Sequence, residues 1–150
     1  MRTRRLLGPA LVITVLAVGL FVASPVLAGG RPFTTALAGA AEVPTGDLDA
    51  SGTATVWVNP GTGTVCYSWS VTGAATPIFA AHIHHAVAGV AGPVVVPLPP
   101  TGPSSGSGCV TGVARSLALD IIEHPSDYYV NTHNAEFPTG AARGQLSRTP

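Results

Sequence analysis

The chain contains one uninterrupted hairpin pattern: Gly52-Thr-Ala-Thr-Val-Trp-Val-Asn59, then Pro60-Gly-Thr-Gly63, then Thr64-Val-Cys-Tyr-Ser-Trp-Ser-Val-Thr72. In the first run, small or apolar side chains recur at every second position, at Ala54, Val56 and Val58. The second run alternates in the same way, with one face made of Val65, Tyr67, Trp69 and Val71. Two alternating runs joined by a turn rich in Gly and Pro predict a β-hairpin with one buried face.

Short segments of strand-like sequence lie on both sides of this hairpin, at 33–40, 78–84, 93–98, 127–133 and 141–147. One helix is predicted over 115–123, with Pro125 as its stop signal. The low-complexity segment 99–108 is expected to be a mobile surface loop. Together these features predict an all-β domain, an antiparallel Greek-key sandwich or barrel of about seven or eight strands with one short helix.

The first 28 residues have the features of a secretory signal peptide. Three arginines within the first five residues precede an apolar run over 6–22, and Val26 and Ala28 occupy the −3 and −1 positions of a cleavage site. We therefore expect a signal peptide at 1–28, a single domain at 29–150, and a secreted or cell-surface protein. An uncleaved membrane anchor is the alternative, since the apolar run approaches the length that spans a bilayer.

Without the signal peptide, the chain has four arginines, no lysine and seven acidic residues, a net charge of −3. Nucleic acids and anionic membranes both attract clustered Lys and Arg, so neither is expected as a partner. No segment beyond residue 28 is long and apolar enough to insert into a membrane after cleavage. The partners that remain are an extracellular protein or a cell-surface component.

The chain has two cysteines, Cys66 and Cys109. In an oxidising compartment two cysteines allow one intramolecular pairing, so a Cys66–Cys109 disulfide is predicted. A catalytic thiol is the alternative, but neither cysteine lies in a recognisable reactive motif.

The order of several short motifs resembles the CHRD (chordin-type) domain family over about residues 33–147. These motifs are Leu37-Ala-Gly39, Glu42-Val-Pro44, Gly52-Thr-Ala54, Ala81-His-Ile-His84, Gly92-Pro93, Tyr128-Tyr-Val-Asn-Thr-His133, Gly140 and Arg143-Gly-Gln-Leu146. The resemblance implies an extracellular domain, because CHRD domains occur singly in exported microbial proteins and in several copies in chordin, which binds growth factors. It implies no settled activity for the single-domain members.

Three histidines form a candidate metal site. His82 and His84 lie two apart on the strand expected at 78–84, so both rings project from one face, whereas His85 points to the other. His133 joins them if the strand at 127–133 is a neighbour. Three imidazoles favour copper or zinc.

Polar residues expected to support the site are Tyr129, Asn131 and Arg143. In the alternative interpretation these groups, like the histidines, form a structural hydrogen-bond network, with Arg143 paired to Glu42 or Glu136.

His82, His84, His133 and Arg143 also carry a faint resemblance to copper–zinc superoxide dismutase, a Greek-key barrel with a His-x-His strand, a later histidine and a late arginine. The long zinc loop of that family has no counterpart here.

Three hypotheses for function follow from these observations. The first is a non-catalytic extracellular binding or structural module, which small size, low charge and the family resemblance favour. The second is a copper- or zinc-binding module that uses the His-x-His strand. The third is a copper redox enzyme. Whether the protein is an enzyme stays open between them, with a non-enzymatic role preferred.

The signal-peptide interpretation predicts that the exported protein begins at Gly29. N-terminal sequencing of secreted material, together with intact mass measurement, checks this start site. Material that retains Met1 would instead support the anchor alternative.

Overall fold

The computed structural model describes residues 29–149 of the 150-residue chain, so the predicted signal peptide lies outside the described residues. The strands are β1 (Arg31–Ala38), β2 (Ser51–Asn59), β3 (Thr64–Thr72), β4 (Ala80–His85), β5 (Val94–Pro97), β6 (Ser105–Val110), β7 (Tyr128–His133), β8 (Ala142–Gln145) and β9 (Ser147–Arg148). The helical elements are α1 (Arg115–Glu123) and two 3₁₀ turns, η1 (Gly39–Ala41) and η2 (Pro125–Asp127).

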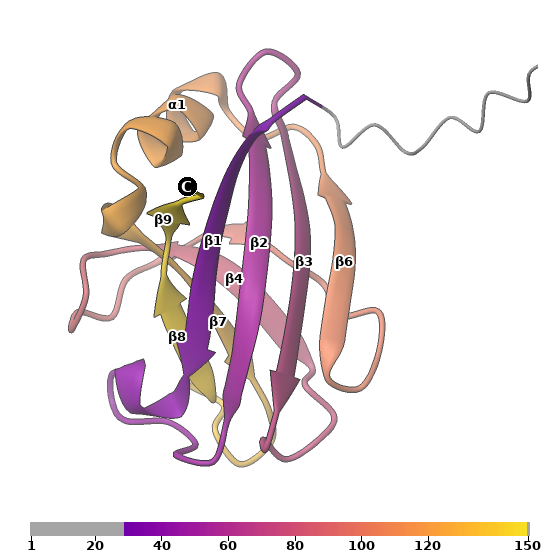
Figure 1. Ribbon diagram of the computed structural model, residues 1–150, viewed down its shortest axis with the longest axis vertical. Coiled ribbons are helices and arrows are strands. Elements are labelled where there is room, and N and C mark those ends of the chain that lie inside the picture. The colour runs from indigo at the N-terminus through magenta and orange to yellow at the C-terminus, as the bar shows by residue number, and fades with distance from the viewer. Residues whose placement is uncertain (1–28, 150) are drawn as a thin grey trace, which may run out of the picture.

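The strands form one antiparallel sheet in the order β5-β4-β7-β8-β1-β2-β3-β6, and the short β9 pairs with β1. Figure 1 shows the sheet curling so that β4 and β7 lie behind β1, β2 and β3. The Trp69 Nε1–H donates to the Leu98 carbonyl at 3.1 Å, and the Tyr67 hydroxyl donates to the Pro99 carbonyl at 2.9 Å. These bonds join β3 to the chain just after β5, so the barrel is nearly closed. The expected antiparallel all-β class with one helix is confirmed.

The predicted hairpin forms β2 and β3, and its apolar face points into the barrel. The register pairs Val56 with Tyr67 and Ala54 with Trp69, and all four side chains are buried. Inward residues of the other strands complete the core, among them Phe33, Leu37, Ile83, Val96, Tyr128 and Val130. The period-2 pattern therefore identified the correct faces of this hairpin.

The segment expected to be a mobile loop contains the start of strand β6, so that prediction is wrong for residues 105–108. β6 pairs with β3, with Gly106 opposite Trp69 and Gly108 opposite Tyr67. A Cβ added to Gly106 would lie 2.6 Å from the Trp69 indole. The glycines make room for aromatic rings on the neighbouring strand, and this need for small residues explains a composition that otherwise indicates flexibility.

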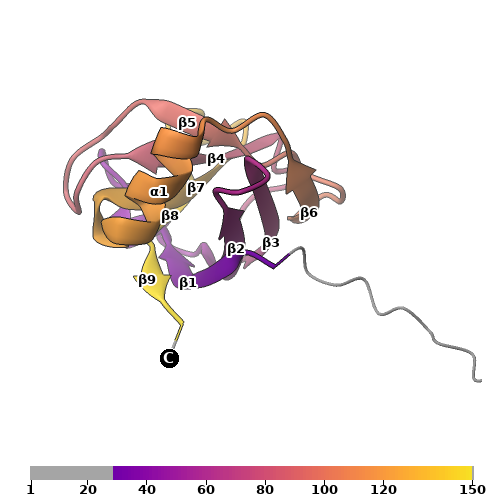
Figure 2. The same ribbon diagram turned by 90° about the horizontal axis from the view of Figure 1, so that it is seen from above.

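Helix α1 matches its predicted bounds and buries Ala118 and Ile121 against the core. It lies beside one end of the barrel, as Figures 1 and 2 show. Among residues 29–149, no helix has the length and hydropathy needed to cross a membrane. The last predicted strand is divided in two, since β8 ends at Gln145 and β9 begins at Ser147.

Cys66 and Cys109 form a disulfide and lie directly opposite each other on β3 and β6, with their Cα atoms 3.9 Å apart. Replacing both residues with alanine removes a cross-link between positions separated by 43 residues. We expect the variant to lose about 4 kcal/mol of unfolding free energy, because its unfolded chain gains entropy. Urea denaturation beside the oxidised wild type measures the loss, and coincident unfolding curves would contradict it.

Candidate metal centre

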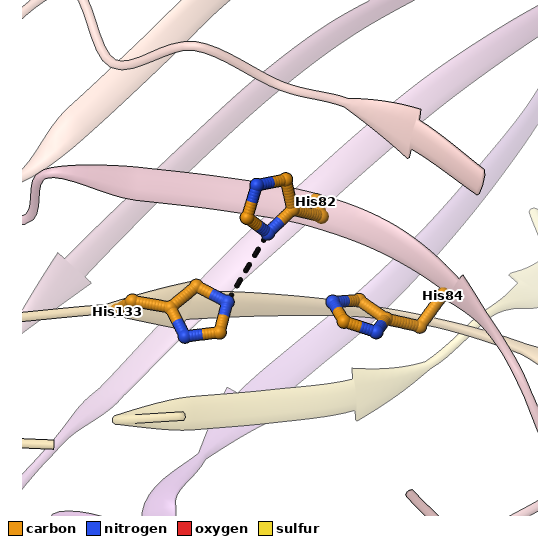
Figure 3. Close-up of side chains that lie close together, drawn as sticks. All are labelled: His82, His84 and His133. Atoms are coloured by element: carbon orange, nitrogen blue, oxygen red, sulfur yellow. Dashed lines mark hydrogen bonds between the residues drawn. The ribbon is translucent and has the colours of Figure 1, made fainter. Parts of the chain in front are cut away.

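The three histidines come from two neighbouring strands and gather on the outer face of the barrel. His82 and His84 lie on β4 and His133 lies at the end of β7. One nitrogen of each ring lies within 4.8 Å of the others, and His82 Nδ1 is 3.1 Å from His133 Nε2. Figure 3 shows the rings facing one another, with this contact as a dashed line. The apolar neighbours Ala81 and Ile83 point inward to the core. Because side chains along β4 alternate between the two faces of the sheet, the histidines lie on one face and the core residues on the other.

Backbone carbonyls determine which nitrogen carries the proton in two of the rings. His84 Nδ1 lies 2.8 Å from the Gly92 carbonyl, and His133 Nδ1 lies 3.1 Å from the Pro138 carbonyl. A carbonyl only accepts, so each Nδ1 is the donor and each neutral ring keeps a lone pair on Nε2. The Nε2 of His84 is buried and has no hydrogen-bond partner. Such carbonyl contacts are typical of the outer shell that orients metal-ligating histidines.

The environment of the cluster favours neutral imidazoles. Burial, with smaller contributions from His133 and His84, lowers the pKa of His82 from 6.5 to about 4. Burial also lowers the pKa of His84, against the opposing effects of the Gly92 carbonyl and the nearby Asn131 amide. It lowers the pKa of His133 as well. All three rings are therefore uncharged at neutral pH, which is the form that binds a metal.

Arg143 holds a loop over this outer face. Its guanidinium donates to the carbonyls of Val90 and Val87 at 2.8 and 2.9 Å and to Gln145 Oε1 at 3.2 Å. It also lies over the Tyr129 ring, 3.4 Å from the centroid. The expected hydrogen-bonded pairing of Arg143 with Glu42 or Glu136 is therefore wrong, because carbonyls take its donors. The arginine is almost fully buried, and it stabilises the covering loop.

The same loop is also bonded to side chains of β7 and β8. The Gln145 side chain donates to the Ala86 carbonyl at 2.6 Å, and the Gly92 N–H donates to the Tyr129 hydroxyl at 3.1 Å. The Tyr129 ring stacks on His84, with centroids 4.8 Å apart. The loop 86–93 thus shields an outward face of the sheet from water, which explains why polar residues there are buried.

Asn131 is buried beside the histidines, and Glu42 is buried near Asn131 and Arg143. Asn131 is 1% exposed, lies directly opposite His82 on β4 and Arg143 on β8, and has an Oδ1 atom without a partner. The Oε1 atom of Glu42 also lacks a partner. Burial raises the pKa of Glu42 to about 7, although the Arg143 charge and hydrogen bonding to Val43 and Asn131 oppose that shift.

The structure thus brings together the residues singled out from the sequence, His82, His84, His133, Tyr129, Asn131 and Arg143, and leaves His85 elsewhere. The His85 ring is exposed and stacks on Tyr128. The sequence identified Glu42 only as a possible ion-pair partner. Its place in the Glu42-Val-Pro44 motif was the available signal. Nothing local in the sequence indicated the contacts of the Gly92 and Pro138 carbonyls.

Three uncharged imidazole rings can hold one metal ion through one ring nitrogen each. Metal–nitrogen bonds of about 2.0–2.1 Å place tetrahedral ligand atoms roughly 3.3 Å apart. The 3.1 Å between His82 Nδ1 and His133 Nε2 already matches that spacing. Within residues 29–149 no other His, Cys, Asp or Glu joins the cluster. A tetrahedral ion held by these three rings would therefore have one position for a further ligand.

Comparison with known proteins identifies a family but no individual relative. A family model described as CHRD domain matches residues 33–146. No curated protein and no solved structure matches the chain. The likeness to copper–zinc superoxide dismutase is not borne out by these comparisons.

The raised pKa of Glu42 predicts a pH-dependent effect of Glu42→Gln. The folded state binds a proton at Glu42 more tightly than the unfolded chain does. The contribution of this proton to the unfolding free energy is therefore complete below pH 4.5 and is lost as pH rises through about 7. Wild type loses this contribution and Glu42→Gln does not. The unfolding free energy of Glu42→Gln minus that of wild type should therefore rise by about 3 kcal/mol from pH 4.5 to about 7, at about 1.4 kcal/mol per pH unit.

Chemical denaturation of both proteins from pH 4.5 to 8 measures this difference. Contributions from the histidines occur in both proteins and cancel. Curves that stay parallel across the range would show that Glu42 titrates normally.

Proposed function

Because this chain belongs to the CHRD-domain family, we propose that it is an exported extracellular module that binds one Cu(II) or Zn(II) ion through His82, His84 and His133. The pattern of residues 1–28 supports export. The Cys66–Cys109 disulfide also supports it, since such bonds persist in oxidising compartments. Of the three hypotheses from the sequence, this one joins the extracellular module to the metal-binding alternative.

The observation that carries the metal proposal is the unpartnered Nε2 of His84. His84 is 8% exposed, and its other ring nitrogen is bonded to a carbonyl. Buried polar atoms in folded proteins almost always have a partner, so a structural network leaves this lone pair unexplained. A metal ion bound also by His82 and His133 would take it.

The donor set supports copper or zinc over other ions. Three imidazole nitrogens suit Cu(II) and Zn(II), whereas Mg²⁺ and Ca²⁺ prefer oxygen ligands. The three histidines are uncharged, so the ion would bring a positive charge to a face where Arg143 is already buried. The Glu42 carboxylate is the acidic group beside this arginine, and its ionisation on metal binding would offset the added charge.

Metal titration of the chelator-stripped protein tests the proposal. We expect wild type to bind one equivalent of Cu(II) or Zn(II), and His84→Ala to bind at least about 100-fold more weakly, because a ligand is lost. His85→Ala is the matched control, since His85 lies on the same strand with its ring outside the cluster. It should bind like wild type.

The structural alternative makes the opposite prediction. Wild type and His84→Ala would then bind metal equally weakly, and His84→Ala would lose about 1–3 kcal/mol of unfolding free energy by leaving the Gly92 carbonyl without its partner. Isothermal calorimetry and denaturation on the same three proteins distinguish the two outcomes.

A further inference from the structure

Asn131 lies on the face of the sheet that carries the three histidines. On β7 it lies between Tyr129 and His133, and across the sheet it lies directly opposite His82. Side chains at alternate positions of a strand share a face, and directly opposed residues point the same way. The Asn131 side chain therefore emerges between the strand positions that supply the three imidazoles.

The Oδ1 atom of Asn131 is an acceptor without a donor. Asn131 is 1% exposed, so bulk water does not reach it, and burying an unpaired carbonyl oxygen is costly. The neighbouring His84 Nε2 is a second buried atom with only a lone pair to offer. With the amide in this orientation the two acceptors do not pair, and a metal at Nε2 together with a hydrogen-bond donor at Oδ1 would satisfy both.

Among residues 29–149, no protein group donates to this Oδ1 atom. The Arg143 guanidinium donates to the Val87 and Val90 carbonyls and to Gln145. On its other side the Asn131 amide faces the Glu42 carboxyl, whose pKa it lowers. Metal binding favours the ionised form of Glu42, and an ionised carboxylate only accepts hydrogen bonds. In the metal-loaded site this contact therefore engages the NH₂ end of the amide and leaves Oδ1 for another donor.

We propose that the fourth ligand of the metal is a water molecule that donates a hydrogen bond to Asn131 Oδ1. The open position then selects small ligands whose coordinating atom carries a hydrogen, such as water or ammonia, over acceptor-only anions such as azide. This inference rests on the metal site proposed above. Asn131 acts as a positioning residue, since it contacts the bound ligand rather than the ion.

Pulsed electron paramagnetic resonance on the Cu(II)-loaded wild type tests the bound water directly. Exchange into D₂O should reveal a strongly coupled exchangeable deuteron of an inner-sphere water. Wild type that binds one equivalent of copper without this signal would overturn the inference while leaving the metal site intact. Failure to bind stoichiometric copper would instead overturn the metal site, and the inference with it.

Azide titration of the copper form tests the role of Asn131. Asn131→Leu has a similar shape and no acceptor, so azide no longer leaves a buried carbonyl unpaired and should bind about tenfold more tightly than to wild type. Asn131→Asp keeps an acceptor oxygen and should retain the weak azide binding. Equal azide affinity in wild type and Asn131→Leu would overturn the inference.

A second result would also overturn it. If Asn131→Leu lost copper affinity by tenfold or more and wild type showed no exchangeable deuteron, Asn131 Oδ1 would be a ligand of the metal itself. If Asn131→Leu did not fold, the wild-type deuterium measurement would still decide.

Discussion

The pairing of β4 with β7 in a single register underlies both the fold and the candidate site. That register places His82 opposite Asn131 and His84 opposite Tyr129, while Ile83 and Val130 face each other inside the barrel. Because strand side chains alternate with a period of two, a slip of one residue in either strand would send its histidines into the core and its apolar residues to the outside. Burial of Ile83 and Val130 therefore stabilises the one register in which the three imidazoles meet.

A second layer, built by polar groups, covers the outer face of these strands. Burying the Arg143 charge is costly unless its donors are satisfied, and here the loop carbonyls of Val87 and Val90 satisfy them. The same bonds bring Gly92 within reach of His84. The hydrogen bonds that offset the cost of burying Arg143 are thus the same bonds that hold the loop beside the histidines. The conformation of the loop is therefore coupled to the orientation of His84.

The sequence predicted most where the pattern is local. Alternation fixed the faces of β2 and β3, and the two-residue spacing correctly placed His82 and His84 on one face, away from His85. The sequence-based prediction was wrong at β6. There Gly106 and Gly108 leave space for the large rings of Trp69 and Tyr67 on the neighbouring strand. The sequence also did not indicate the partners of Arg143, because they are backbone carbonyls, which every residue has whatever its side chain. The buried state of Glu42 depends on contacts distant in the chain, so composition and periodicity gave no sign of its altered pKa.

The candidate site lies wholly on the outside of the barrel, and this location bears on how such a domain can evolve. The core residues and the polar residues alternate along the same strands and point to opposite faces of the sheet, so a polar side chain of the site can change without changing the shape of the core. A lineage could exchange a histidine for another side chain without repacking the interior. One conserved scaffold could therefore carry a metal in some descendants and a purely structural or partner-binding surface in others.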